Sequence, residues 1–233
     1  MFCFTKKTRF FDRVHHALVL VLIAACGLAA AQEGVLSQLY AARPPAGSSY
    51  VRVVNPEAPA LAVRVAKGSV QSIGGQTPAG SYAIVHGGQD FSVQVGDTEI
   101  TGLQVRPDSF HTLVLRRSGK RYAVTPVDDT TDTEDALKAE LRFYNLARAC
   151  PEAALALSPS GTLVFRSVAA NGSAARSVNP VRAAVAAQCG QVSTPAQQLP
   201  ALQPGDHLSL FLLGTAQAPV LVMQTNRTDV FKR

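Results

Sequence analysis

The residues that could carry out catalysis do not form a catalytic pattern in this sequence. A serine hydrolase or acyl transferase would contain a Gly-Asp-Ser-type block or a G-x-S-x-G sequence, with an Asp and a His further along the chain. Neither block is present. The histidines beyond the N-terminal segment, His86, His111 and His207, each lie beside a turn sequence. We therefore expect a protein that is not an enzyme and that has no catalytic residue and no cofactor.

The cysteines predict one disulfide bond. Cys3 and Cys26 lie in the N-terminal segment, which leaves Cys150 and Cys189. An isolated pair in an oxidising compartment favours a disulfide, which would close a loop of about 40 residues and stabilise the fold by roughly 2–4 kcal/mol. A metal site is less favoured because no histidines occur at ligand spacing, and a redox pair is usually C-x-x-C. We expect no metal.

Residues 1–31 have the pattern of a bacterial export signal, with a basic start, an apolar stretch at 17–25 and small residues beyond it. The apolar stretch is shorter than the roughly 20 residues that span a bilayer. Two processing sites fit this segment. Cleavage after Ala31 would release the protein into the periplasm, whereas Ile23 to Cys26 fits a lipobox in which Cys26 becomes acylated.

A duplicated pattern organises the rest of the chain. Val51-Arg52-Val53-Val54-Asn55 is repeated, class for class, 90 positions later by Leu141-Arg142-Phe143-Tyr144-Asn145. Leu103 to Asp108 is likewise echoed by Leu202 to Asp206. Two similar units in the same order indicate tandem domains, because a solenoid would need three or more repeats. The paired Arg-x-x-Asn runs, being shared by both repeats, are expected to serve folding.

Short runs of alternating apolar residues fill both repeats. In the first, Leu61/Val63/Val65 and Phe91/Val93/Val95 alternate with polar residues, and turn sequences such as Gly96-Asp97 separate the runs. About seven such runs, spaced by roughly ten residues, are typical of a β-sandwich. We predict an all-β protein of two tandem β-sandwich domains from an internal duplication. The predicted segments are an export signal (1–31), an N-terminal tail (32–49), domain 1 (50–127), an acidic linker (128–138), domain 2 (139–228) and a C-terminal tail (229–233).

The charged residues argue against a nucleic-acid partner. The formal charge of the chain is +6, and residues 1–31 carry +3 of it. The remainder is small and shows no cluster of Lys and Arg interleaved with aromatic residues. The linker, in contrast, holds five acidic residues between 128 and 135. Carboxylates are suitable Ca²⁺ ligands, but the spacing lacks the glycine and the terminal glutamate of an EF-hand loop, so a solvated linker is favoured.

Two short sequences occur in the second repeat alone. Val168-Ala169-Ala170-Asn171-Gly172 ends in a pair that suits a tight hairpin turn. Asn179-Pro180-Val181-Arg182 suits a turn that leads into a strand. Together with Leu39-Tyr40, Tyr50 to Asn55 and the layout of two repeats, these sequences resemble the AlgF family of periplasmic proteins of alginate O-acetylation.

This resemblance implies a non-enzymatic partner in a machine that acetylates an exported polysaccharide, either alginate or a similar polymer such as cellulose. Its implied partners are a membrane-bound O-acyltransferase, an SGNH-type polysaccharide O-acetyltransferase and the polysaccharide itself. The alternative is a carbohydrate-binding or envelope-structural protein that shares the sandwich fold without a role in acetylation.

Features that occur once are freer to serve recognition than features that both repeats share. We therefore predict a binding surface for the partner protein or the polymer in the second repeat, where guanidinium groups could contact carboxylates. An equally simple interpretation is that Asn171-Gly172 is only a hairpin turn and Asn179-Pro180 only a strand entry. The residues of the predicted surface are Asn171, Gly172, Arg176, Asn179, Pro180 and Arg182.

Overall fold

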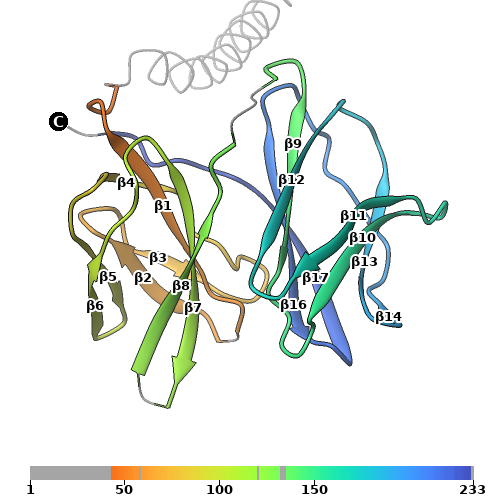
Figure 1. The fold of residues 1–233 in the computed structure, drawn as a ribbon, viewed down its shortest axis with the longest axis horizontal. Helices are drawn as coiled ribbons and strands as arrows, with labels where there is room; N and C mark the ends of the chain where they lie inside the picture. The colour runs from red at the N-terminus through yellow and green to blue at the C-terminus, as the bar shows by residue number, and fades with distance from the viewer. Residues whose placement is uncertain (1–42, 58, 120, 132–134, 232–233) are drawn as a thin grey trace, which may run out of the picture. The chain divides into compact units, whose positions relative to one another are not determined.

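The computed structural model of the chain describes residues 43–57, 59–119, 121–131 and 135–231. The predicted export signal, the alternative acylation site Cys26 and the Leu39-Tyr40 motif lie outside this part of the chain. Within it, all seventeen elements are β-strands, which confirms the predicted all-β class (Figure 1). The described residues thus contain no helix of the length and apolar character needed to cross a bilayer.

The first repeat forms two four-stranded sheets with the orders β4-β1-β7-β8 and β3-β2-β5-β6. Strands β1 and β7 pair in parallel, and the other neighbours are antiparallel. The strands are β1 (Ser48–Val54), β2 (Leu61–Val65), β3 (Gln71–Ile73), β4 (Ala83–His86), β5 (Phe91–Val95), β6 (Thr98–Leu103), β7 (Phe110–Ser118) and β8 (Arg121–Asp128).

The second repeat has the same topology. Its sheets have the orders β12-β9-β16-β17 and β11-β10-β13-β14, with β15 added to β13, and again one pair, β9 with β16, is parallel. The predicted pair of β-sandwiches from an internal duplication is therefore confirmed (Figure 1). The strands are β9 (Ala139–Asn145), β10 (Glu152–Ser158), β11 (Leu163–Ala169), β12 (Ser173–Val178), β13 (Ala184–Cys189), β14 (Val192–Ser193), β15 (Gln197–Gln198), β16 (His207–Thr215) and β17 (Ala218–Thr225).

Each sandwich has its own apolar core, built by alternation along the strands. In β5, Phe91, Val93 and Val95 are buried while Ser92 and Gln94 are half-exposed, as a period of two requires. The same alternation supplies the inner faces of the other strands of the first repeat and gives the second repeat a separate core. These two cores account for the strand-forming pattern of the sequence.

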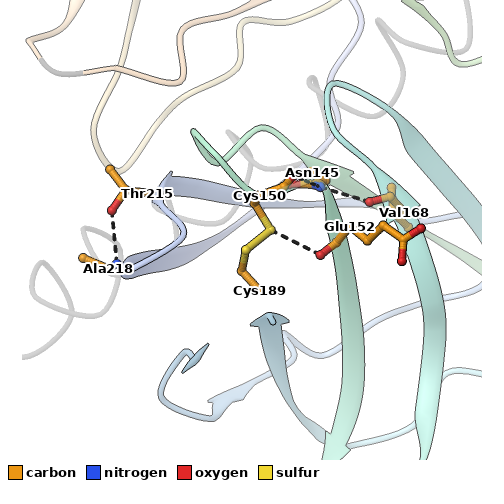
Figure 2. The surroundings of a disulfide bond; sticks show 7 residues. All are labelled: Asn145, Cys150, Glu152, Val168, Cys189, Thr215 and Ala218. Carbon is orange, nitrogen blue, oxygen red and sulfur yellow. Dashed lines mark hydrogen bonds between the residues drawn. A yellow bond between two sulfur atoms is a disulfide. The ribbon is translucent and has the colours of Figure 1, made fainter. Parts of the chain in front are cut away.

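The asparagine that ends each repeated Arg-x-x-Asn run links the two sheets of its sandwich. Asn55 Nδ2 donates to the carbonyl oxygens of Pro59 and Ile73 at 3.1 and 3.2 Å. Asn145 Nδ2 makes the equivalent bonds to Cys150 and Val168 at 3.0 and 2.9 Å (Figure 2). Because these carbonyl groups are buried or partly buried, each would lose its partner without the amide. The shared asparagines therefore serve folding.

The predicted disulfide is present in the second sandwich. Cys150 follows β9 and Cys189 ends β13, and their Cα atoms are 5.7 Å apart (Figure 2). Both side chains lie in the core of this repeat. The bond therefore joins the segment between β9 and β10 to the end of the strand that pairs with β10.

A third apolar cluster lies where the two repeats meet. The outer face of the sheet that contains β1 contributes Val54 and Val114, and the outer face of the sheet that contains β9 contributes Tyr144 and Phe211. The rings of Tyr144 and Phe211 stack with centroids 4.9 Å apart. Residues 44–229 consequently form one compact unit. The domain limits set from the sequence stay a prediction.

The end of the second repeat also pairs with the first. The amide of Tyr82 donates to the carbonyl oxygen of Arg227, and the amide of Asp229 donates to the carbonyl oxygen of Tyr82, both at 2.8 Å. Ser81 Oγ donates to Asp229 Oδ1. The chain therefore crosses between the repeats twice, once through the linker and once through residues 226–229.

Replacing both Cys150 and Cys189 with alanine should lower the free energy of unfolding by about 2–4 kcal/mol, because the unfolded chain gains the freedom that the closed loop removes. Urea unfolding of the mature protein without reductant measures this difference. Reductant should destabilise the natural protein by a similar amount and leave the double variant unchanged. Equal stability of the oxidised and reduced natural protein would contradict a structural disulfide.

Candidate functional site

Two arginines at equivalent positions of the repeats are buried where the outer sheet faces meet. Arg52 lies on β1 and is 0% exposed, and Arg142 lies on β9 and is 6% exposed. A buried guanidinium loses its hydration, which costs several kcal/mol unless other groups bind it. The surroundings of these two residues therefore decide how the repeats can pack.

Arg52 is bound mostly by the second repeat. Its Nη1 donates to Asn226 Oδ1, and its Nη2 donates to the hydroxyls of Tyr144 and Ser209, each at 2.8 Å. Its Nε donates to Thr112 Oγ1 of its own repeat at 2.8 Å. Every nitrogen of this guanidinium thus has an acceptor, and three of the four acceptors come from the second repeat.

Arg142 reaches in the opposite direction. Its Nη2 donates to the backbone oxygen of Asp129 at 2.7 Å and to Thr131 Oγ1 at 2.6 Å. Its Nε donates to Glu140 Oε1 at 3.2 Å. Two buried guanidinium groups and the carboxylates of Asp129 and Glu140 consequently meet in one cluster with balanced formal charge.

The contacts are reciprocal because the cluster is built twice from the same positions. Pairing of β1 with β7 sets Arg52 opposite Thr112, and pairing of β9 with β16 sets Arg142 opposite Ser209. Asp129 and Asn226 are also equivalent. The backbone N–H of Asp129 donates to the first residue of β7, and that of Asn226 donates to the first residue of β16. The equivalent residues are Arg52, Thr112 and Asp129 in the first repeat, and Arg142, Ser209 and Asn226 in the second.

Burial holds the tyrosines of this cluster in their neutral form. It raises the pKa of Tyr144 to about 12 and the pKa of Tyr82 well above its ordinary value. Burial opposes the charge of Arg52, but its interactions with Tyr144, Tyr82 and Asp129 outweigh that effect and raise its pKa. Arg52 therefore stays charged, with its guanidinium carbon 4.5 Å from the centre of the Tyr82 ring.

Next to this cluster lies a cavity of about 410 Å³. It falls within the size range of small-molecule and side-chain binding pockets. Residues far apart in the sequence form its walls, because both repeats, the linker and the C-terminal crossing contribute. The lining residues include Tyr82, Asp108, Phe110, Asp129, Thr130, Thr131, Glu140, Arg142, Asp206, His207 and Asn226.

Glu140 forms one wall of the cavity and has a lowered pKa. Burial alone would raise this pKa, but hydrogen bonds with His207 and Thr131 and the charge of Arg142 outweigh it. Glu140 Oε1 lies 3.7 Å from His207 Nδ1 and 3.2 Å from Arg142 Nε. The carboxylate is therefore ionised over a wider pH range than a glutamate in water.

The structure places Asn171 and Gly172 in the tight turn between β11 and β12, as the sequence indicates. Asn171 adopts a φ of 60°, which asparagine tolerates better than most residues. Its side-chain oxygen accepts a hydrogen bond from Arg116 Nη2 of β7. The turn thus contacts the first repeat, a relation that the sequence does not suggest.

Arg176, Asn179, Pro180 and Arg182 are all exposed, and none of them lines the cavity. Arg176 lies on β12, the edge strand of its sheet. The other three lie in the connection between β12 and β13. The expected strand start at Asn179-Pro180 is therefore wrong, because β13 begins only at Ala184. The surface predicted from the sequence and the cavity are separate features.

One serine and histidine pair has catalytic spacing without catalytic geometry. Ser109 Oγ lies 3.0 Å from His111 Nε2, but both residues are buried and the hydroxyl donates to the backbone oxygen of Arg106. The hydroxyl therefore accepts a hydrogen bond from the Nε2–H group of His111, and in this arrangement the ring is not placed to act as its general base. Burial lowers the pKa of His111, which favours this neutral ring.

No group of three or more His, Cys, Asp or Glu residues arranged to hold a metal ion occurs in the described part of the chain. Residues 132–134 of the acidic linker lie outside that part. The described linker residues contribute instead to the cavity wall and to the Arg142 contacts.

Comparison with known proteins decides the family. The family model described as "Alginate O-acetyl transferase AlgF" matches residues 19–207, well over half of the chain. The chain belongs to the AlgF family. It is similar to alginate biosynthesis protein AlgF of Pseudomonas putida, at 28% identity over 87% of this chain and 91% of that protein. Identity to the proteins of that name from Pseudomonas syringae pv. tomato and Pseudomonas fluorescens is 26% in each case, over 89% and 77% of this chain and 92% and 79% of theirs.

The sequence of this AlgF-family chain does not indicate the cavity. The one sequence feature that belongs to the neighbouring cluster is the repeated Arg-x-x-Asn run, whose two arginines are buried in the structure. An arginine in an alternating strand is normally expected to face water. Two of the partners that make burial tolerable are Asp129 for Arg142 and Asn226 for Arg52. They come from the linker and from the residue after β17, which no local pattern connects to either arginine.

Replacing Arg52 with methionine should lower the free energy of unfolding by about 3–5 kcal/mol, because the carboxylate and hydroxyls of the buried cluster lose a cation. Urea unfolding at neutral pH measures the loss. Arg64→Met on β2, where the side chain is exposed, is the matched control and should change stability by less than about 0.5 kcal/mol. Equal unfolding midpoints for the two variants would show that the cluster does not hold the repeats together.

Acid should weaken the same contacts. A carboxyl group whose pKa is lower in the folded than in the unfolded chain stabilises the fold above its unfolded pKa, and this contribution is lost as the pH falls toward the folded value. The stability of the natural protein should therefore decline between about pH 5 and about pH 3, and Glu140→Gln should reduce the decline. Thermal unfolding across this range provides the test, with the exposed Glu99→Gln as control. Identical pH profiles for the natural protein and Glu140→Gln would exclude this role.

Proposed function

We propose that this chain is a non-catalytic accessory protein of a periplasmic complex that O-acetylates an exported polysaccharide, alginate or a similar polymer. The observation that carries the proposal is the match along most of the chain to a family named for alginate O-acetylation and to proteins named for alginate biosynthesis. Such a match extends over both repeats, so it concerns the whole two-sandwich unit.

The chemistry of the buried polar groups supports a non-catalytic role. Thr112 and Tyr82 hydroxyls donate to Asp129, and Ser209 Oγ donates to Asn226 Oδ1 at 2.7 Å. The Thr112 and Tyr82 hydroxyls share one carboxylate, Asp129, and all three hydroxyl-bearing residues are buried among the contacts that join the repeats. Together with the orientation of Ser109, this arrangement provides structure and leaves acyl transfer to a partner enzyme.

The proposed partners are the SGNH-type O-acetyltransferase and the membrane-bound O-acyltransferase of the same system. A protein that positions two enzymes needs surfaces held in a fixed relation, and the buried cluster supplies this by joining the sandwiches. The exposed arginines of the β12 region, Arg176 and Arg182, offer a positive surface for an acidic patch or for the uronate polymer.

Deleting the gene should reduce the acetyl content of the exported polysaccharide, and the natural gene should restore it. A complementing copy with Arg176→Ala and Arg182→Ala should restore less acetylation while leaving the thermal unfolding temperature nearly unchanged, because both side chains are exposed. Acetyl ester content per sugar residue is the measurement, together with affinity capture of the tagged protein from the envelope. The matched control is Arg64→Ala with Arg121→Ala in the first repeat.

Three outcomes separate the alternatives. Unchanged acetylation in the deletion strain, with capture of polysaccharide by the purified protein, would favour a carbohydrate-binding protein without a role in acetylation. Full restoration by the Arg176/Arg182 variant would remove the β12 surface but not the proposed function. Acetyl transfer or ester hydrolysis by the purified protein alone would contradict the non-catalytic role.

A further inference from the structure

The cavity beside the buried cluster has a charge that the proposed function does not explain. Four carboxylates line it, from Asp108, Asp129, Glu140 and Asp206, against the guanidinium of Arg142 and the ring of His207. A uronate or any other anion would meet net repulsion there. The cavity therefore differs in its preferred ligand from the arginine-bearing surface at β12.

One of these carboxylates has an oxygen that accepts no hydrogen bond. Asp129 is 5% exposed and its Oδ2 accepts bonds from Tyr82 and Thr112, whereas its Oδ1 has no hydrogen-bond partner. The nearest cationic nitrogen, Arg142 Nη1, is 3.9 Å from that oxygen. A buried carboxylate oxygen without a donor is destabilising. A cation held in the cavity that Asp129 lines would offset part of this cost.

Arg142 alone does not make the cavity a receptor for anions, because two of its three nitrogens are already bound by residues of the wall. Nε binds Glu140, and Nη2 binds both the Asp129 backbone and Thr131. The third nitrogen, Nη1, makes no hydrogen bond within the described part of the chain but lies 3.9 Å from Asp129 Oδ1, so a carboxylate that approached it would also approach that anion. Its place in the wall is therefore structural.

The aromatic residues of the wall are also partly occupied. One face of Phe110 stacks on Tyr50, with centroids 4.5 Å apart and planes 9° apart. The rings of Tyr82 and Phe110 are nearly perpendicular, with centroids 5.4 Å apart. The guanidinium carbon of Arg52 lies over the Tyr82 ring, 4.5 Å from its centre. A sugar ring usually needs an open aromatic face, so these contacts favour a compact cation over a saccharide unit.

We propose that this cavity receives a positively charged side chain, lysine or arginine, from a partner protein. The carboxylates of Asp108 and Asp206 form the outer part of the site, since Asp108 is exposed and Asp206 half-exposed, and Asp129 lies at its buried end. A single basic anchor in such a pocket is a frequent centre of protein interfaces. The identity of the partner as a member of the acetylation complex rests on the proposed function, whereas cation binding does not.

The test uses the mature chain and short blocked peptides followed by NMR. The probes are acetyl-Gly-Arg-Gly-amide, acetyl-Gly-Lys-Gly-amide and the neutral isostere acetyl-Gly-citrulline-Gly-amide, with cellotetraose as a neutral saccharide. One or both basic peptides should shift the backbone amides of Thr130, Thr131 and Asn226. The citrulline peptide should bind at least about tenfold more weakly than the arginine peptide, because it lacks the charge.

A charge-reduced variant makes the test specific. Asp108→Asn with Asp206→Asn keeps an acceptor for the amides of Gly47 and Gln203, which these carboxylates now bind. It should weaken the basic peptides about fivefold or more. Asp90→Asn with Asp97→Asn, in turns of the first repeat, makes the same change of net charge elsewhere and should leave the affinity within about twofold.

Each outcome is decisive for the cavity. Absence of shifts at Thr130, Thr131 and Asn226 with both basic peptides would overturn the proposal, as would equal weakening in the two double variants. Shifts caused by cellotetraose and not by the basic peptides would assign the cavity to a saccharide instead. If the basic peptides bind but deletion of the gene leaves polysaccharide acetylation unchanged, the cation site stands and only the proposed function fails.

Discussion

The fold depends on the burial of two guanidinium groups between its sandwiches. Arg52 and Arg142 are removed from water by the same sheet faces that supply their acceptors, so each repeat satisfies the charge of the other. A shift of one sheet along the other by a single residue would leave hydroxyls and carboxylates without donors. The apolar cluster of Val54, Tyr144 and Phe211 supplies area, but it is the polar cluster that fixes the relative position of the sheets.

Divergence between equivalent positions accounts for the cavity. Tyr50 and Phe110 form a stacked aromatic pair in the first repeat, while the corresponding positions of the second repeat hold the carboxylate of Glu140 and the imidazole of His207. One wall is therefore apolar and the other charged. If the two repeats had kept the same residues at these positions, both walls would be apolar or both charged. Because the residues differ, the duplicated fold forms a cavity with one apolar and one charged wall.

Much of the fold was predictable because it rests on local signals. Alternation in runs such as Phe91 to Val95 gives strands, and the repeated Arg-x-x-Asn run gives the duplication. The disulfide followed from the count of cysteines. The packing of the two outer sheet faces was not predictable, since Arg52 in a strand ordinarily marks a solvent face. The cavity depends on that packing, so its residues, which lie between Tyr82 and Thr228, carry no shared local pattern.

The reciprocal contacts have a bearing on how such a chain arose. In symmetric dimers, the same residues of both subunits face each other across a twofold axis. The equivalent residues of the two repeats face each other here in a similar way. The buried cluster is thus consistent with an ancestral single-sandwich protein that paired with its own copy before the two genes fused. The halves of a single chain can change separately, as the different residues at the equivalent positions Asp129 and Asn226 illustrate. The second crossing at residues 226–229 ties the two halves together at a further point of the chain.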